Sequence, residues 1–187
     1  LEGLLIVYET KELPFEGKLF NYLQHISSGA KQWRGTNLHT TTQLWQNFRN
    51  IVYNLNQDKL AKPLSDSEFN QVKKQIESLG QHNNTPYLAG KFLYGFNGKS
   101  QVQITLDTGK LVILTLFDQS QIGAGNTVYQ IARQVERPAI LPGKQSRRFD
   151  TTLLINGLPI IQIEEKSDHV SAKNALNQMR RYIAEHQ

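Results

Sequence analysis

One stretch of the sequence decides the fold: Arg148-Phe-Asp150-Thr-Thr-Leu-Leu-Ile-Asn-Gly-Leu-Pro-Ile-Ile-Gln162-Ile-Glu164-Glu-Lys166. Two apolar runs flank an Asn-Gly pair, which is the strongest short-range signal of a β-hairpin. The first strand carries an aspartate, and the second strand ends in Glu-x-Lys. We therefore expect two carboxylates and a lysine on adjacent strands.

The register of this hairpin follows from its side-chain pattern. A strict two-residue loop would place Asp150 opposite Ile163 and turn Glu164 to the other face of the sheet. One extra residue in the turn pairs polar with polar and apolar with apolar instead. We therefore expect a three-residue loop with Gly157 in the left-handed conformation. The polar positions of one parity are Asp150, Thr152, Gln162, Glu164 and Lys166, and the apolar positions of the other are Leu153, Ile155, Ile161 and Ile163.

In that register Asp150, Glu164 and Lys166 share one face. Two carboxylates supply the oxygen ligands that a hard divalent cation prefers. Such a cation stabilises charge on phosphoryl oxygens and activates water, and a neighbouring lysine can orient that water or offset the developing charge. The set fits metal-dependent phosphodiester cleavage. The same spacing also fits an ordinary amphipathic hairpin with solvated charges.

A helix is predicted from Ser171 to His186, because apolar residues recur there at helical spacing. Gln178 and Tyr182 lie four residues apart and so point the same way. Arg180 and Arg181 add positive charge next to them.

Together, Asp150, Glu164-x-Lys166 and Gln178-x-x-x-Tyr182 resemble the N-terminal PD-(D/E)xK nuclease domain of the restriction (R) subunit of type I restriction–modification enzymes. The resemblance is close over residues 147–182 and weaker over residues 15–75. It implies that Asp150 and Glu164 are metal ligands and that Lys166 is the catalytic lysine. Gln178 and Tyr182 would form the accessory motif of the family.

Two further glutamates bear on this resemblance. Glu16 is similar to the acidic residue that many members of the superfamily carry on their first helix, near the metal. Glu165 departs from the family, which usually has an apolar residue there, and Ser167 stands where a second lysine is usual. By parity Glu165 points away from the site. Because an unpaired buried carboxylate is costly, we expect it to be exposed or paired with an arginine or lysine.

The resemblance also implies the cofactors and partners. The metal would be Mg²⁺ or Mn²⁺, the substrate double-stranded DNA, and the other members of the complex methyltransferase and specificity subunits. ATP would be used only by a motor downstream of these residues, because the sequence has no phosphate-loop motif. We accordingly expect a piece of a longer, cytoplasmic chain.

Bulk properties agree with a polyanionic partner. The net charge is +5 and the pI is about 9.4. The absence of cysteine excludes disulfides and thiolate metal sites, and no apolar run approaches the roughly 18 residues of a membrane span. The basic loop with Lys144, Arg147 and Arg148 is either a phosphate clamp beside the site or a solvated loop.

The whole pattern predicts an α+β or α/β/α sandwich, restriction-endonuclease-like, with a mixed, mostly antiparallel sheet flanked by helices. We expect a single domain, with a helical part over about residues 15–80 and a catalytic sheet and helix over about 100–187. The expected helices cover 16–27, 42–55 and 66–79, and residues 81–91 are expected to form a loop. Strands are expected at 101–106, 110–117 and 128–135, with 110–117 central because it is almost wholly apolar.

Two other functions remain open on sequence grounds. The chain can be another nuclease of the same superfamily, acting in repair or recombination. It can also be a non-catalytic DNA-binding or assembly module that retains the fold, although the intact Asp/Glu/Lys set argues against that.

Overall fold

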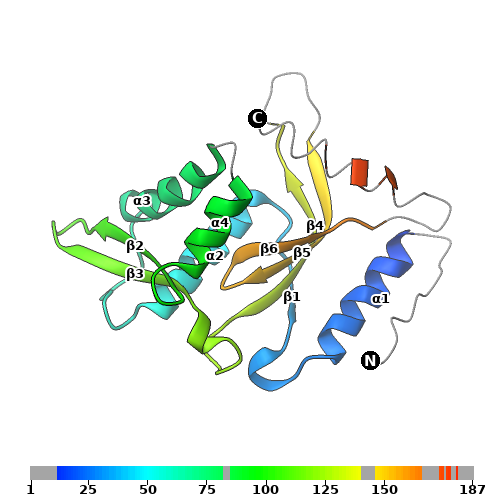
Figure 1. Cartoon of the computed structure of the whole chain (residues 1–187), viewed down its shortest axis with the longest axis horizontal. Helices are drawn as coiled ribbons and strands as arrows, with labels where there is room; N and C mark the ends of the chain where they lie inside the picture. The colour runs from blue at the N-terminus through cyan, green and yellow to red at the C-terminus, as the bar shows by residue number, and fades with distance from the viewer. Residues whose placement is uncertain are drawn as a thin grey trace.

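The structure is a computed structural model that describes residues 12–81, 85–139 and 146–165, together with positions 173, 174, 176, 177 and 180. It confirms the α+β class, with helices beside mostly antiparallel sheets (Figure 1). Within these ranges, none of the helices combines the length and the apolar character needed to cross a membrane. The elements are, in order, α1 (Glu12–His25), η1 (Gly29–Lys31), β1 (Arg34–Thr36), α2 (Thr41–Leu55), α3 (Asp66–Glu77), η2 (Ser78–Gln81), α4 (Thr85–Tyr94), β2 (Lys99–Thr105), β3 (Leu111–Asp118), η3 (Gln119–Gln121), β4 (Tyr129–Arg137), β5 (Arg147–Ile155) and β6 (Leu158–Ile163).

The main sheet has four strands in the order β1-β4-β5-β6. The short strand β1, which the sequence analysis missed, runs parallel to β4, whereas β4, β5 and β6 are antiparallel neighbours. Strand β6 lies at one edge, which suits Pro159 because a proline cannot donate a ladder hydrogen bond. In Figure 1 this sheet and α1 occupy one side of the molecule.

The prediction that residues 110–117 form a central strand is wrong. Strand β3 pairs only with β2, in a separate two-stranded sheet. Its side chains alternate, so that Leu114 and Leu116 are fully buried while Leu111 and Ile113 are 61% and 51% exposed. A continuous apolar run therefore does not mean burial on both faces here.

The predicted loop at residues 81–91 is also wrong, because residues 85–94 form α4. Pro86 lies in the first turn of that helix, where a missing backbone N–H costs nothing. Helices α2 and α3 begin within one residue of their predicted starts, and Thr40 with Gln43, and Ser65 with Glu68, form complete capping boxes there. Helix α1 begins at Glu12, earlier than the predicted start at residue 16.

The largest hydrophobic core lies between α2, α3 and the β2–β3 sheet. Phe48, Val52, Val72, Leu114 and Leu116 are its most deeply buried members. The fully buried Asn56, just after α2, joins helix to sheet: its Oδ1 accepts from the Thr115 N–H at 2.8 Å, and its Nδ2 donates to the Thr115 carbonyl at 2.9 Å.

The β5–β6 hairpin has the predicted register but reaches it differently. Asn156 (φ 52°) and Gly157 (φ 77°) form a two-residue turn, with Ile155 opposite Leu158. Leu154 then pairs with Pro159 but Leu153 with Ile161, so that Ile160 is an extra residue, a β-bulge. The predicted three-residue loop is therefore wrong.

Beyond the bulge, polar residues do pair with polar residues. Thr152 lies opposite Gln162, and its hydroxyl donates to Gln162 Oε1 at 2.9 Å. The predicted burial of the apolar parity holds only in part, because Leu153 is buried whereas Ile161 is 48% exposed.

The Asn156-Gly157 turn is fixed from both sides. Asn156 Oδ1 accepts from the Val128 N–H at 2.9 Å, and Asn156 Nδ2 donates to the Leu116 carbonyl at 3.2 Å. A Cβ at Gly157 would lie 3.0 Å from Phe48 Cα, in the backbone of α2. The turn therefore connects the two sheets and rests directly on a helix.

We predict that Gly157→Ala destabilises the chain more than Gly109→Ala. Both glycines have positive φ, 77° and 84°, but nothing lies within 4 Å of a Cβ at Gly109. Gly109→Ala should cost about 1 kcal/mol of unfolding free energy for the left-handed backbone. Gly157→Ala should cost about 1–3 kcal/mol more for overpacking against α2. Urea unfolding measures both, and equal losses would show that α2 yields to the new methyl group.

Candidate active site

Helix α1 brings Glu16 to the sheet. Phe20, one turn later on the same helix face, lies against β1, where any Cβ at Gly35 would overlap its ring. The guanidinium of Arg133 in β4 lies over the ring of Phe20, with its Cζ 5.5 Å from the ring centroid. The absence of a side chain at Gly35 is thus what lets α1 approach β1 and β4.

The Glu16 carboxylate is buried, with the residue only 3% exposed, and is fully engaged. Arg133 Nη2 lies 3.1 Å from Oε2. Gln134 Nε2 donates to Oε2 at 3.0 Å and to Oε1 at 3.3 Å. A buried ion pair is tolerated best when additional hydrogen bonds satisfy its remaining atoms. Gln134 supplies them for Glu16, whereas the buried Nε of Arg133 makes no hydrogen bond within the part of the chain that the structure describes.

Asp150 in β5 binds the chain just after β6. Its Oδ2 accepts from the backbone N–H of Glu165 at 2.8 Å. The ladder ends with Thr151 opposite Ile163, so the next residues are Asp150 in β5 and Glu164, the first residue after β6. The hairpin register therefore carries these two predicted metal ligands to neighbouring positions at one end of the sheet.

The expectation for Glu165 is wrong. Glu165 is only 2% exposed, and its Oε1 accepts a hydrogen bond from the Thr151 hydroxyl at 2.8 Å rather than from an arginine or lysine. Strand β6 ends at Ile163, so strict side-chain alternation no longer applies two residues later. Its Oε2 is buried and makes no hydrogen bond within the part of the chain that the structure describes.

The pKa of Glu165 is raised from 4.5 to about 7, mainly by burial. The negative charges of Glu16 and Asp150 contribute to this rise, whereas the Thr151 hydrogen bond and Arg133 oppose it. Glu16, Asp150 and Glu165 therefore form one electrostatically coupled group. Over the described ranges, however, no three acidic or histidine side chains form a complete metal-binding cluster.

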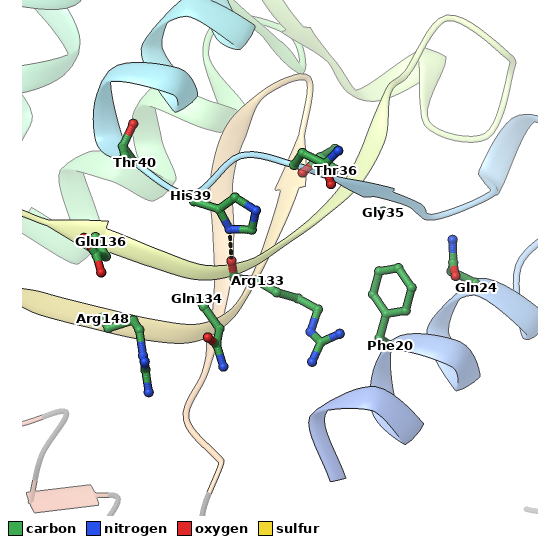
Figure 2. Close-up of a pocket in the computed structure, with 11 residues that line it drawn as sticks. Phe20, Gln24, Gly35, Thr36, His39, Thr40, Arg133, Gln134, Glu136 and Arg148 are labelled. Carbon is green, nitrogen blue, oxygen red and sulfur yellow. Dashed lines mark hydrogen bonds between the residues drawn. The ribbon is translucent and has the colours of Figure 1, made fainter. Parts of the chain in front are cut away.

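An open pocket of about 890 Å³ lies beside these carboxylates, between α1, β1, β4 and β5. In Figure 2, Arg133, Gln134 and Arg148 extend from the strands to the side of the sheet on which Phe20 of α1 lies. On the other side of β4, His39 Nδ1 donates to the Arg133 carbonyl at 3.0 Å. The pocket thus combines two guanidinium groups with an amide next to the acidic group.

The other predicted site residues divide into two sets. Arg148 and Arg180 are exposed, and Arg147 is partly buried in β5 opposite Arg137. The second set lies outside the described residues: Lys144, Lys166, Gln178, Arg181 and Tyr182. Much of the predicted helix 171–186 also lies there, although each of its five described positions is helical.

Sequence reasoning missed Arg133 and Gln134, which hold Glu16. Gln134 has a φ of 52° within a strand, a conformation that costs a non-glycine residue on the order of 1–3 kcal/mol. Nothing in the local sequence signals it, because glutamine has no special preference for this conformation and the flanking residues are those of an ordinary strand.

We predict that Glu165→Gln raises the unfolding free energy of the metal-free chain, relative to wild type, more at pH 8 than at pH 5. The pKa of Glu165 in the folded chain is raised from 4.5 to about 7. Its stabilising contribution is therefore fully present below pH 4.5 and is lost as pH rises through 7. Glutamine keeps the acceptor for Thr151 but cannot ionise.

The unfolding free energy of the variant, measured with EDTA present, should gain about 2 kcal/mol over wild type between pH 5 and pH 8. Glu77→Gln, which removes an exposed carboxylate on α3, is the control. A difference from wild type that stays the same at both pH values would contradict the raised pKa.

The chain is similar in sequence to known type I restriction proteins. The family model described as the type I restriction enzyme R protein N terminus matches residues 18–187. The endonuclease subunit of the type I restriction enzyme SauMSSORF170P of Staphylococcus aureus (strain MSSA476) is 27% identical over 173 residues, 91% of this chain and 16% of that protein. The SsaAORF53P endonuclease subunit of Staphylococcus saprophyticus is 32% identical over 75% of this chain and 13% of its own length.

A third relative, the EcoprrI endonuclease subunit of Escherichia coli, is 38% identical over 42% of this chain and 23% of its own length. The chain thus spans only a small part of each of these relatives. The family match covers most of the chain and includes both strands of the hairpin on which the candidate site is built. The chain belongs to the family of type I restriction enzyme R proteins, whose N-terminal part it matches.

Proposed function

We propose that this chain is the nuclease domain of a type I restriction enzyme and that it hydrolyses phosphodiester bonds of double-stranded DNA with the help of Mg²⁺ or Mn²⁺. One observation carries the proposal. Asp150 and Glu164 directly follow the last pair of the hairpin ladder, and the carboxylates of Asp150 and the buried Glu16 both contribute to the raised pKa of Glu165. The alternation of polar and apolar residues in the hairpin would be satisfied by uncharged polar residues, so it does not explain why acidic residues stand at this end of the sheet.

The donor set fits a divalent cation. Like charges held close together are unfavourable without a cation, and Glu165 has a buried oxygen with no hydrogen bond in the described part of the chain. Mg²⁺ is often bound through one or two carboxylates, with water and substrate phosphate completing its shell. Asp150 and Glu164 would be those ligands, and Glu16 would lie behind them, so a complete three-residue cluster is not required.

The residues would divide the chemistry between them. The cation, when bound, neutralises charge on the scissile phosphate. Lys166 would orient the attacking water. As the water oxygen forms a bond to phosphorus, the water gives up a proton to solvent, one P–O ester bond breaks, and the leaving oxygen takes up a proton. The exposed Arg148, which lines the pocket beside the carboxylates, would contact a DNA phosphate without reading the sequence.

The relatives are named as endonuclease subunits of type I restriction enzymes. By that relationship, the complete enzyme would include methyltransferase and specificity subunits, and an ATP-driven motor would lie outside these residues. DNA sequence recognition would belong to the specificity subunit. Cleavage would therefore depend on this domain, and ATP hydrolysis would not.

We predict that Asp150→Asn and Glu164→Gln each lower DNA cleavage by the assembled enzyme by more than about 100-fold, because even outer-shell changes at metal sites cost 10–100-fold. Lys166→Ala should have a similar effect. ATP hydrolysis and translocation should be unchanged. Glu77→Gln, a surface carboxylate on α3, should leave all activities intact.

The assay is cleavage of circular DNA carrying a recognition site, run beside ATPase measurements on the same preparations. Full cleavage by the Asp150→Asn enzyme would place the cutting site elsewhere and favour a non-catalytic module. Parallel loss of cleavage and ATPase activity would show that the two carboxylates support assembly of the enzyme rather than the chemistry.

We predict that the chain binds DNA weakly, with little sequence preference and with an affinity that falls steeply with salt, because counterion release drives such binding. Arg148→Ala should lower the affinity and reduce the salt slope by about 1. Lys110→Ala removes the same charge from the exposed β2–β3 turn and should change neither. Equal effects of both variants, in fluorescence anisotropy titrations, would mean that only net charge matters.

A further inference from the structure

We propose that Gln134 is a positioning residue: its left-handed backbone turns the amide onto Glu16 and so fixes that carboxylate in the acidic group that includes Asp150. The role toward a divalent cation rests on the proposed function. The contact between Gln134 and Glu16 does not, and can be tested separately.

Side-chain alternation shows why the unusual backbone is needed. Successive residues of a strand point to opposite faces, yet Arg133 and Gln134 are consecutive in β4 and both bind Glu16. With ordinary strand geometry only one of the two could reach α1. The φ of 52° at Gln134 reorients its side chain to the face of Arg133.

Gln134 also lies next to the strand that carries Asp150. Arg133 pairs with Thr151 and Val135 pairs with Phe149, so Gln134 lies directly across from Asp150. Through its amide it reaches from that position to the carboxylate on α1. One residue of β4 thus connects the helix that carries Glu16 to the strand position of Asp150.

His39 makes hydrogen bonds to the backbone before and after Gln134, and these hold Gln134 in this conformation. On one side, His39 Nδ1 donates to the carbonyl of Arg133 at 3.0 Å. On the other, the N–H of Glu136 donates to the His39 carbonyl at 2.7 Å. A strained backbone persists only where its neighbours over-determine it, and such positions cluster at functional sites.

The chemistry of an amide suits this role. Arg133 already balances the charge of Glu16, so a second cation here would oppose binding of a divalent ion. The amide of Gln134 contacts both oxygens of Glu16 without adding charge. It orients the carboxylate without reducing the net negative charge of the acidic group, which would attract a metal ion.

The test compares Gln134→Gly, Gln134→Lys and wild type in this 187-residue chain. Glycine accepts the positive φ and removes the amide, whereas lysine keeps a donor to Glu16 and adds a charge. Asn97→Gly is the matched control, because Asn97 also has a φ of 52° but lies in the turn before β2.

Mn²⁺ binding is followed by electron paramagnetic resonance. Gln134→Gly should keep its thermal stability but bind Mn²⁺ about 10-fold more weakly, and Gln134→Lys should bind it more weakly still. Asn97→Gly, which relieves the same positive φ in a turn, should leave Mn²⁺ affinity unchanged. Wild-type affinity in Gln134→Gly would overturn the positioning role.

A double-mutant cycle between Gln134→Gly and Glu16→Gln, in metal-free unfolding, separates this role from the proposed function. We expect the combined change in the unfolding equilibrium constant to deviate from the product of the single changes by about 5-fold. Additive effects would overturn the positioning role even if Mn²⁺ binds. A coupled cycle in a wild-type chain that binds no Mn²⁺ would support the positioning of Glu16 and count against the metal site.

Discussion

Two requirements on one hairpin shape the main sheet, and a single extra residue satisfies both. The Asn156-Gly157 turn must be tight, because Gly157 lies against the backbone of α2 and Asn156 bonds Val128 and Leu116. The strands beyond it must nevertheless be shifted by one position to pair polar with polar. The bulge at Ile160 supplies that shift after the turn rather than inside it. Without it, the parity of every following residue in β6 would reverse.

The end of that hairpin concentrates negative charge in a poorly solvated place. Glu16 and Glu165 are almost completely buried, and Asp150 is close enough to raise the pKa of Glu165. Arg133 is paired with Glu16 and offsets part of this charge. The folded chain tolerates the remainder through hydrogen bonds from Thr151, Gln134 and the Glu165 backbone. Negative charges held this close together with little solvent are unfavourable, and the raised pKa of Glu165 reflects this.

The sequence predicted those features that depend on local pattern. The period-two alternation of β5 and β6 gave the correct pairing of Thr152 with Gln162, because a slip would have mixed polar and apolar faces. It did not reveal how the shift is made, since a three-residue loop and a tight turn with a bulge produce the same pairing. Parity also failed for Glu165, which lies beyond the end of the strand.

Features that depend on distant parts of the chain were beyond sequence reasoning. The apolar run of β3 looked central, but only the packing of α2 and α3 on one face decides which of its side chains are buried. Arg133 and Gln134 contact Glu16 only because α1, more than a hundred positions away in the sequence, packs beside them. The positive φ of Gln134 arises from its neighbours, His39 in particular, and not from its own preference.

The wide sequence separation of Glu16 and Arg133, 117 positions, also sets an order on biosynthesis. On a ribosome, α1 emerges long before β4, and Glu16 cannot pair with Arg133 until Arg133 has been translated. The acidic group closes only after β5 and residue 165 have left the exit tunnel, when α2 and α3 can already have collapsed onto β2–β3. Contacts of such high order form late and slowly. Translation therefore delivers α2, α3 and the β2–β3 sheet before it delivers the last carboxylates of the acidic group.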